Sequence, residues 1–126
     1  MRMKLGELAQ KTPSLIKLGG IDLPAITAFR IKSLVDKLEP HKSNYDEQMR
    51  KLFTKYGEEK DGQYIIKQDK AKQFLEERNK LDELEIDTDI SEVEITLTND
   101  ITLSAMDISM LSGLIKFKID GEEVKQ

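Results

Sequence analysis

The chain has 126 residues, a length that suits one domain built around one hydrophobic core. Hydrophobic residues make up 38% and charged residues 35%, which is polar for a globular domain but not typical of a disordered one. The absence of cysteine excludes disulfides and thiolate metal sites, and it fits a reducing cytoplasm. No long apolar run is present, so we expect a soluble cytoplasmic protein with neither a signal peptide nor a membrane span.

The net charge of −4 is unevenly distributed along the chain. Residues 1–57 hold eleven Lys/Arg against six Asp/Glu, whereas residues 58–126 hold nine against eighteen. Such asymmetry can mark a charged binding surface. We favour the simpler interpretation that 1–126 is a single domain in which a basic helical half and an acidic half fold together and partly neutralise each other.

The first segment with helical periodicity runs from Leu5 to Leu18. Pro13 interrupts it, so the pattern predicts a short helix, a break, a further turn and a stop at Gly19-Gly20. Gly20 is soon followed by a stronger start signal, because Asp22 can cap a helix and Pro24 suits a first turn.

Apolar residues recur at helical steps through the next stretch, at Leu23, Ile26, Phe29, Leu34, Val35 and Leu38. Pro40 should end or kink this helix, yet the stripe resumes nearly in phase from Tyr45 to Tyr56. Either one bent helix spans residues 22–56 or two helices meet at a tight corner, and Gly57 would cap the end. A helix of this length needs a partner along its side, which favours a kink or a second subunit, so a homo-oligomer is one expectation.

The second half changes its period. An Asp61-Gly62 turn precedes a short β-like stretch at residues 64–66, and Asp69 opens another helix. Residues 84–86, 93–97 and 101–103 then read as short strands. Ser104 and Asp107 form a capping box at the start of a short helix, residues 114–119 read as a closing strand, and residues 122–126 as a frayed tail. The sequence therefore predicts a helix-dominated α+β fold, with a long or kinked helical hairpin and a small antiparallel sheet from the C-terminal half.

Catalytic chemistry has little support in the sequence. His41 is the only histidine, and Ser43 is too close to it along one helix to face it well. Asp87-Thr88-Asp89 resembles the start of a calcium loop, but Glu92 and Thr98 stand where that loop needs glycine and glutamate. Gly19-Gly20 lacks the surroundings of a phosphate-binding loop. We therefore expect a protein that is not an enzyme and that holds no metal or cofactor.

A basic helical face is the most informative candidate for binding. Its members are basic residues and one aromatic residue between positions 30 and 55: Arg30, Lys37, Lys42, Tyr45, Arg50, Lys51 and Lys55. Cations beside aromatic rings can hold phosphates and stack bases. Acidic residues such as Asp46 and Glu47 lie among them, however, so core packing with ion pairs one turn apart explains the pattern better.

Several stretches resemble a known family. Leu23-Pro24 with Ala28-Phe29-Arg30-Ile31, and Tyr45-Asp46-Glu47-Gln48 leading to Lys51 through Glu58, are similar to a family of short uncharacterised proteins of tailed phages and prophages. Glu85-Ile86, residues 101–104 and residues 107–111 follow in similar order and spacing, so the resemblance covers residues 4–117. Residues 116–119 depart from it, because relatives often end in acidic residues there. The resemblance implies a phage origin in a bacterial cytoplasm and supplies no catalytic residue.

Two functions follow as hypotheses. The first is a non-catalytic phage protein that binds a host or phage protein, as an accessory of a molecular machine or as an inhibitor of host defence. The alternative is a nucleic-acid or nucleotide-binding accessory protein that uses the basic helical face. In a variant of the first, the acidic half mimics nucleic acid and occupies a basic groove of a host protein.

Overall fold

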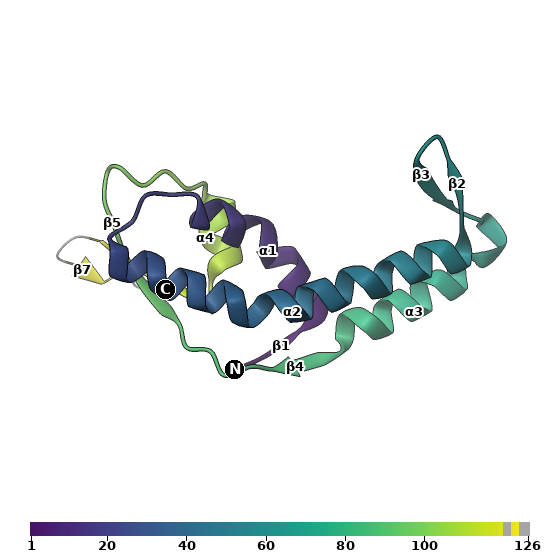
Figure 1. Cartoon of the computed structure of the whole chain (residues 1–126), viewed down its shortest axis with the longest axis horizontal. Coiled ribbons are helices and arrows are strands. Elements are labelled where there is room, and N and C mark those ends of the chain that lie inside the picture. The colour runs from purple at the N-terminus through teal and green to yellow at the C-terminus, as the bar shows by residue number, and fades with distance from the viewer. Residues whose placement is uncertain (120–121, 124–126) are drawn as a thin grey trace. The chain divides into compact units, whose positions relative to one another are not determined.

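The structure is a computed structural model that describes residues 1–119 and 122–123, and its described residues are rich in helix (Figure 1). The helices are α1 (Leu5–Gly19), α2 (Ala25–Tyr56), α3 (Ala71–Glu83) and α4 (Ala105–Leu111), with a 3₁₀ turn at Gln68–Lys70. The strands are β1 (Arg2–Lys4), β2 (Gly57–Lys60), β3 (Gln63–Ile66), β4 (Glu85–Asp87), β5 (Val93–Leu97), β6 (Ile115–Ile119) and β7 (Glu122–Glu123). The predicted helix-dominated α+β class is confirmed.

The chain divides into two compact units, and α1 and α2 each contribute to both. Unit 1 comprises Met1, residues 10–38 and residues 88–126, and unit 2 comprises residues 2–9 and 39–87. Unit 1 carries eight Lys/Arg against ten Asp/Glu, and unit 2 carries twelve against fourteen, so each nets −2. Each unit thus combines segments of the basic and the acidic half.

Unit 1 has a small sheet of order β5-β6-β7 and the helix α4 between β5 and β6. β5 and β6 run parallel, with Val93 opposite Ile115 and Leu97 opposite Ile119, whereas β6 and β7 are antiparallel. The prediction of an antiparallel sheet was therefore wrong for the β5–β6 pair. A parallel pair needs a crossover connection, and the chain that contains α4 supplies it.

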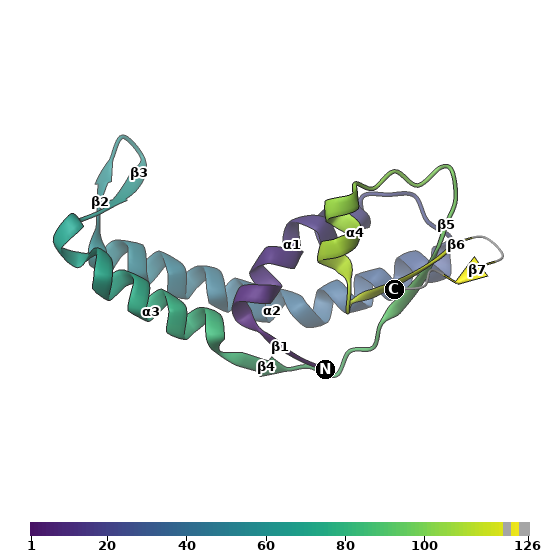
Figure 2. The ribbon, with the colours of Figure 1, turned by 180° about the vertical axis from the view of Figure 1, so that it is seen from behind.

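The core of unit 1 consists of apolar side chains from its helices, its strands and the loops that join them. Those buried are Leu15, Leu18, Ile31, Leu34, Leu38, Ile90, Val93, Ile95, Leu111, Leu114, Ile115 and Phe117. Alternate residues of β5 and β6 point into this core, as expected for strands with one buried face. In Figure 2, α4 lies beside α1, and Lys11 Nζ donates hydrogen bonds of 2.8 and 3.0 Å to the carbonyls of Met110 and Ser112.

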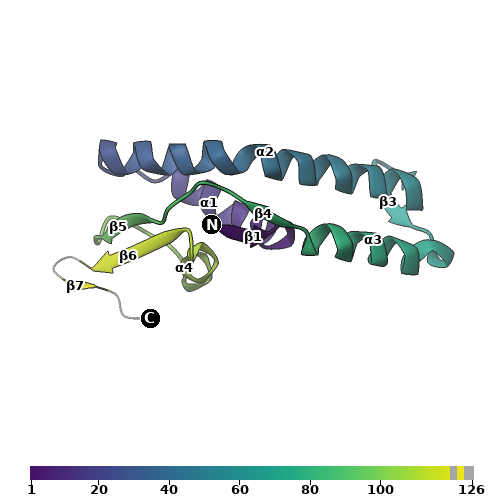
Figure 3. The ribbon, with the colours of Figure 1, turned by 90° about the horizontal axis from the view of Figure 1, so that it is seen from below.

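Unit 2 pairs residues 39–56 of α2 with α3, which lie side by side in Figures 1 and 3. The Phe74 ring lies 5.4 Å from the Phe53 ring and 6.4 Å from the Tyr56 ring, centroid to centroid. β2 and β3 form a hairpin whose turn uses the positive φ angles of Asp61 and Gly62, so the predicted turn is confirmed. The strand β2 itself was missed, because its Glu58-Glu59-Lys60 sequence reads as a loop.

Both interior prolines lie inside continuous helices. α1 runs through Pro13 and α2 runs through Pro40, so the predicted break in the first helix was wrong, and one helix rather than two covers residues 25–56. A proline removes one backbone hydrogen bond, but Leu15 and Leu18 are buried beyond Pro13, and Tyr56 is buried beyond Pro40. Burial of these side chains offsets the lost bond.

Three further predictions differ from the structure. α2 begins at Ala25 rather than at residue 22, and the Pro24 carbonyl accepts the first helical hydrogen bond, from the Ala28 N–H at 2.9 Å. Residues 101–103 form no strand. Glu122 and Glu123 pair with β6 rather than fraying, and residues 124–126 lie outside the described residues. No helix in the described part of the chain is long and apolar enough to cross a bilayer.

Candidate interaction surface

The seven residues of the predicted basic face are divided between the two units. Arg30 and Lys37 belong to unit 1, whereas Lys42, Tyr45, Arg50, Lys51 and Lys55 belong to unit 2. All seven lie on α2.

In unit 2, three of the four basic residues are already paired with carboxylates. Lys42 Nζ lies 2.5 Å from Asp46, Lys51 Nζ lies 4.0 Å from Glu47, and Lys55 Nζ lies 3.3 Å from Glu77. Arg50 forms no ion pair among the residues that the structure describes. The interpretation of this stretch as a helix with ion pairs one turn apart is confirmed for the first two pairs.

Tyr45 also has an internal partner. Its hydroxyl donates a hydrogen bond of 2.7 Å to Asp82 Oδ1 of α3. Burial and this hydrogen bond raise the pKa of Tyr45 to about 12, because both disfavour the phenolate. Tyr45 therefore joins α2 to α3 in unit 2, a role that a periodicity argument could not assign because Asp82 lies far along the chain.

In unit 1, the N-terminal part of α2 leaves apolar side chains in water. Ile26 and Phe29, three residues apart on one side of the helix, are each 70% exposed, whereas Ile31, Leu34 and Leu38 are buried. The predicted apolar stripe is therefore only partly buried: its members Leu34 and Leu38 lie in the core, whereas Ile26 and Phe29 lie on the exposed side of the helix. We call Ile26, Phe29, Arg30, Ser33 and Lys37, which share this side, the exposed α2 face.

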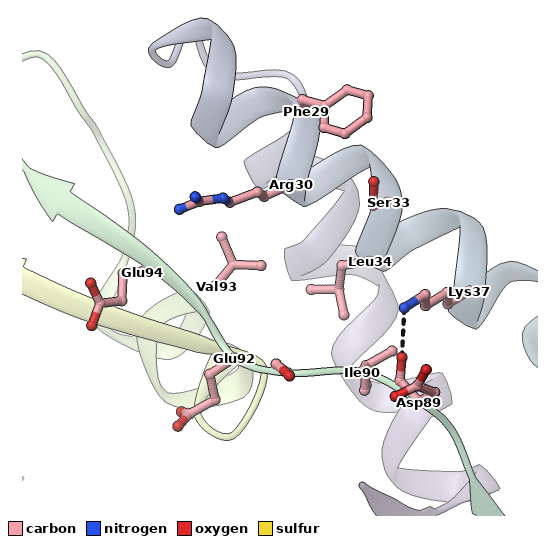
Figure 4. A pocket seen from close by; sticks show the side chains of 11 residues that line it. Phe29, Arg30, Ser33, Leu34, Lys37, Asp89, Ile90, Glu92, Val93 and Glu94 are labelled. Atoms are coloured by element: carbon pink, nitrogen blue, oxygen red, sulfur yellow. Dashed lines mark hydrogen bonds between the residues drawn. The ribbon is translucent and has the colours of Figure 1, made fainter.

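A groove of about 500 Å³ lies between the exposed α2 face and residues 89–94 (Figure 4). On the helix side it is lined by four members of that face and by Leu34. Lys37 Nζ donates a hydrogen bond of 2.6 Å to the Asp89 carbonyl and so bridges the groove at one end. Figure 4 shows Arg30 and Val93 pointing into the space between α2 and β5. Arg30 forms no ion pair among the described residues.

A second groove of about 480 Å³ adjoins the first and shares Arg30 and Glu94 with it. It is lined by residues that precede α2 or open it, and by residues 94–101 of β5 and the loop beyond. The two grooves together follow β5 along the side that faces α2. Arg30 lies where the two grooves meet. Its guanidinium group offers one positive charge and five N–H donors to a groove lined by both polar and apolar residues.

β5 borders both grooves with an unpaired edge. Among the described residues β5 pairs only with β6. The Val93 N–H donates to the Leu114 carbonyl at 3.0 Å, so the backbone of Val93 points toward β6. Because successive residues of a strand turn their backbone groups to opposite sides, Glu94 and Thr96 turn theirs to the open edge.

A polar cluster in unit 1 was predicted from the sequence only in part. The Ser104–Asp107 capping box is confirmed, and Asp107 also accepts hydrogen bonds from Lys17 Nζ at 2.7 Å and Ser14 Oγ at 2.9 Å. These contacts, that from Lys17 foremost, hold the pKa of Asp107 well below its usual range. The cluster fixes α4 against α1, and its α1 members carry no local signal in the sequence.

The other candidate residues named in the sequence analysis do not come together as a site. His41 and Ser43 lie two residues apart on one helix, α2. Thr88 and Ile90, within the stretch that resembles a calcium loop, are buried. No group of three or more His, Asp or Glu side chains in the described residues could hold a metal ion.

The sequence matches no model of a known protein family, and comparisons with curated proteins and with solved structures find no match.

Proposed function

We propose that this chain is a non-catalytic phage protein that works by binding another protein through the exposed α2 face. Its partner is a host or phage protein, and the chain acts as an accessory of a molecular machine or as an inhibitor of host defence. The phage origin is supported by the resemblance of residues 4–117, and the binding role by the surface of unit 1.

The observation that carries the proposal is the exposure of Ile26 and Phe29 beside two grooves. Fully burying a side chain of this size is worth about 1.5–3 kcal/mol, so leaving both 70% exposed forgoes about 2–4 kcal/mol. Apolar side chains rimmed by polar ones are typical of protein-binding surfaces. Arg30 adds a side chain of the type that often dominates the energy of such contacts.

The nucleic-acid alternative receives less support from the same geometry. Three basic residues of the predicted face are neutralised within unit 2, and each unit carries a net charge of −2. Non-specific nucleic-acid binding depends on several cations that contact phosphates together. Arg30 and Arg50 remain without an ion pair among the described residues, but they belong to different units.

Affinity capture from phage-infected bacteria tests the proposal. The bait is the full chain as wild type, as the double variant Ile26→Ser/Phe29→Ser, and as Leu75→Ser. Leu75 is a matched control because it is an apolar residue 50% exposed on α3 of unit 2, whereas the exposed α2 face belongs to unit 1.

We expect a stoichiometric protein partner that wild type and Leu75→Ser retain and that the double variant loses. Circular dichroism should show that all three baits are folded. Absence of any stoichiometric partner, or equal capture by the double variant, would refute the proposal.

A further inference from the structure

The open edge of β5 is the strongest feature of unit 1 that the exposed α2 face does not account for. β1 and β4 have three residues each, and β2 and β3 four, whereas β5 has five. β5 is also the strand that two grooves border along one side. An open edge of this length is a template for another extended chain.

Backbone groups of β5 are available at alternate positions. Glu94 and Thr96 turn their N–H and C=O groups away from β6, and no hydrogen bond of either backbone outside the β5–β6 pair is recorded among the described residues. An added strand would satisfy these groups by main-chain hydrogen bonds. Main-chain bonding alone carries little sequence preference, so the preference must come from side chains.

The side chains on the two faces of β5 differ in kind. Val93 and Ile95 are buried toward the core, whereas Glu94 and Thr96 are exposed on the opposite face. Figure 4 shows Glu92 and Glu94 on the side of the strand away from α2. The Glu94 carboxylate lies 3.2 Å from Lys118 Nζ and 4.0 Å from Lys116 Nζ. On this face of the sheet, therefore, an acidic residue of β5 pairs with basic residues of the neighbouring β6.

The grooves that border β5 are lined by more carboxylates than cations. Asp22, Asp89, Glu92 and Asp100 form no ion pair among the described residues, whereas Glu94 is already paired with β6, and the lining cations are Arg30 and Lys37. Opposite charges on neighbouring strands stabilise a sheet, and like charges oppose pairing. The next strand outward from β5 should therefore be basic on its exposed face.

We propose that β5 binds an extended segment of the partner protein as an added strand, with lysine or arginine on one face and apolar residues on the other. The cationic face lies over Glu92 and Glu94, and the apolar face turns toward Leu34 on the α2 side of the groove. This inference rests on the proposed function and specifies the chemistry of the partner.

Synthetic peptides with blocked termini and about six residues, the length of an ordinary strand, test the inference. One alternates valine with lysine, a second alternates valine with glutamate, and a third is the lysine peptide with alternate amides N-methylated. Binding to the full chain is followed by backbone amide NMR and by hydrogen exchange at Glu94 and Thr96.

We expect the lysine peptide to shift the amide signals of Glu94 and Thr96, to slow their exchange, and to bind about tenfold tighter than the glutamate peptide. The N-methylated peptide, which keeps the charge but loses the edge-bonding amides, should not bind. Glu94→Gln should reduce the preference for lysine, whereas Glu85→Gln on β4 should not.

Equal binding of the lysine and glutamate peptides, undiminished binding of the N-methylated peptide, or shifts away from β5 would each overturn the inference. Such a failure is distinguishable from failure of the proposed function. If Ile26→Ser/Phe29→Ser still lost partner capture, the proposed function would hold, and binding would be located on the helix alone.

Discussion

Tyr45 offers a direct test of whether the predicted basic face is a ligand site or an internal contact. Its hydroxyl is 2.7 Å from Asp82 Oδ1, and Arg78 Nε lies 3.8 Å from Oδ2 of the same carboxylate. Tyr45→Phe removes the hydroxyl and leaves the ring in place. A hydrogen bond to a charged acceptor contributes about 1.5–3 kcal/mol when it is sheltered. Tyr45 is only partly buried, so water recovers part of this and about 1 kcal/mol remains.

The assay is thermal unfolding of wild type, Tyr45→Phe, Asp82→Asn and the double variant. For a chain of this size a loss of 1 kcal/mol lowers Tm by roughly 4 °C. The double-mutant cycle should give a coupling energy of about 1 kcal/mol between Tyr45 and Asp82. A coupling below about 0.3 kcal/mol, or loss of partner capture by Tyr45→Phe, would refute the assignment of Tyr45 as an internal contact.

The pKa of Tyr45 adds a pH dependence with a defined sign. The folded pKa is raised from 10.0 to about 12, so the contribution to stability is complete below pH 10.0 and is lost as pH rises through about 12. Absorbance titration of tyrosinate in wild type and Tyr45→Phe isolates the midpoint of this residue by difference. A midpoint at the ordinary value would show that the hydroxyl is solvated rather than bonded.

Three other changes test the packing of each unit. Gly57→Ala should destabilise unit 2 by about 1–3 kcal/mol in urea unfolding, because the new Cβ would lie 2.6 Å from the Phe53 carbonyl oxygen; an unchanged midpoint would contradict this close approach. Leu111→Ala should lower the free energy of unfolding by about 3 kcal/mol, since this side chain is fully buried, and a loss under 1 kcal/mol would show a looser core. Asp107, whose pKa is depressed mainly by Lys17, should contribute stability that is present above its ordinary pKa of 3.8 and lost as pH falls below it. Asp107→Asn should therefore lose less stability than wild type as the pH falls below 3.8. Identical acid-unfolding profiles of the two proteins would show that Asp107 contributes no pH-dependent stability.

The elements with strong local signals were predictable from the sequence. The Asp61-Gly62 turn and the Ser104–Asp107 capping box each depend on residues a few positions apart, and both are confirmed. The unbroken helix through Pro13 was not predicted, and the choice between one helix and two at Pro40 stayed open, because distant apolar partners decide whether a helix survives a proline.

Periodicity alone could not predict which side of α2 faces water. Ile31, Leu34 and Leu38 recur at helical steps, and so do Ile26 and Phe29, so two apolar stripes compete on one helix. Only the positions of the strands and α1 in unit 1 decide which stripe is buried. The parallel pairing of β5 and β6 was hidden for a similar reason, because strand direction depends on the crossover rather than on either strand's residues.

The affinity of the captured partner for Phe29→Ala, measured by calorimetric titration beside wild type, tests the binding role of the exposed α2 face most directly. An aromatic anchor at the centre of an interface contributes about 2 kcal/mol, so we predict that Kd rises about 30-fold in this variant. An unchanged Kd, with the variant folded as wild type, would show that the partner binds elsewhere on the chain.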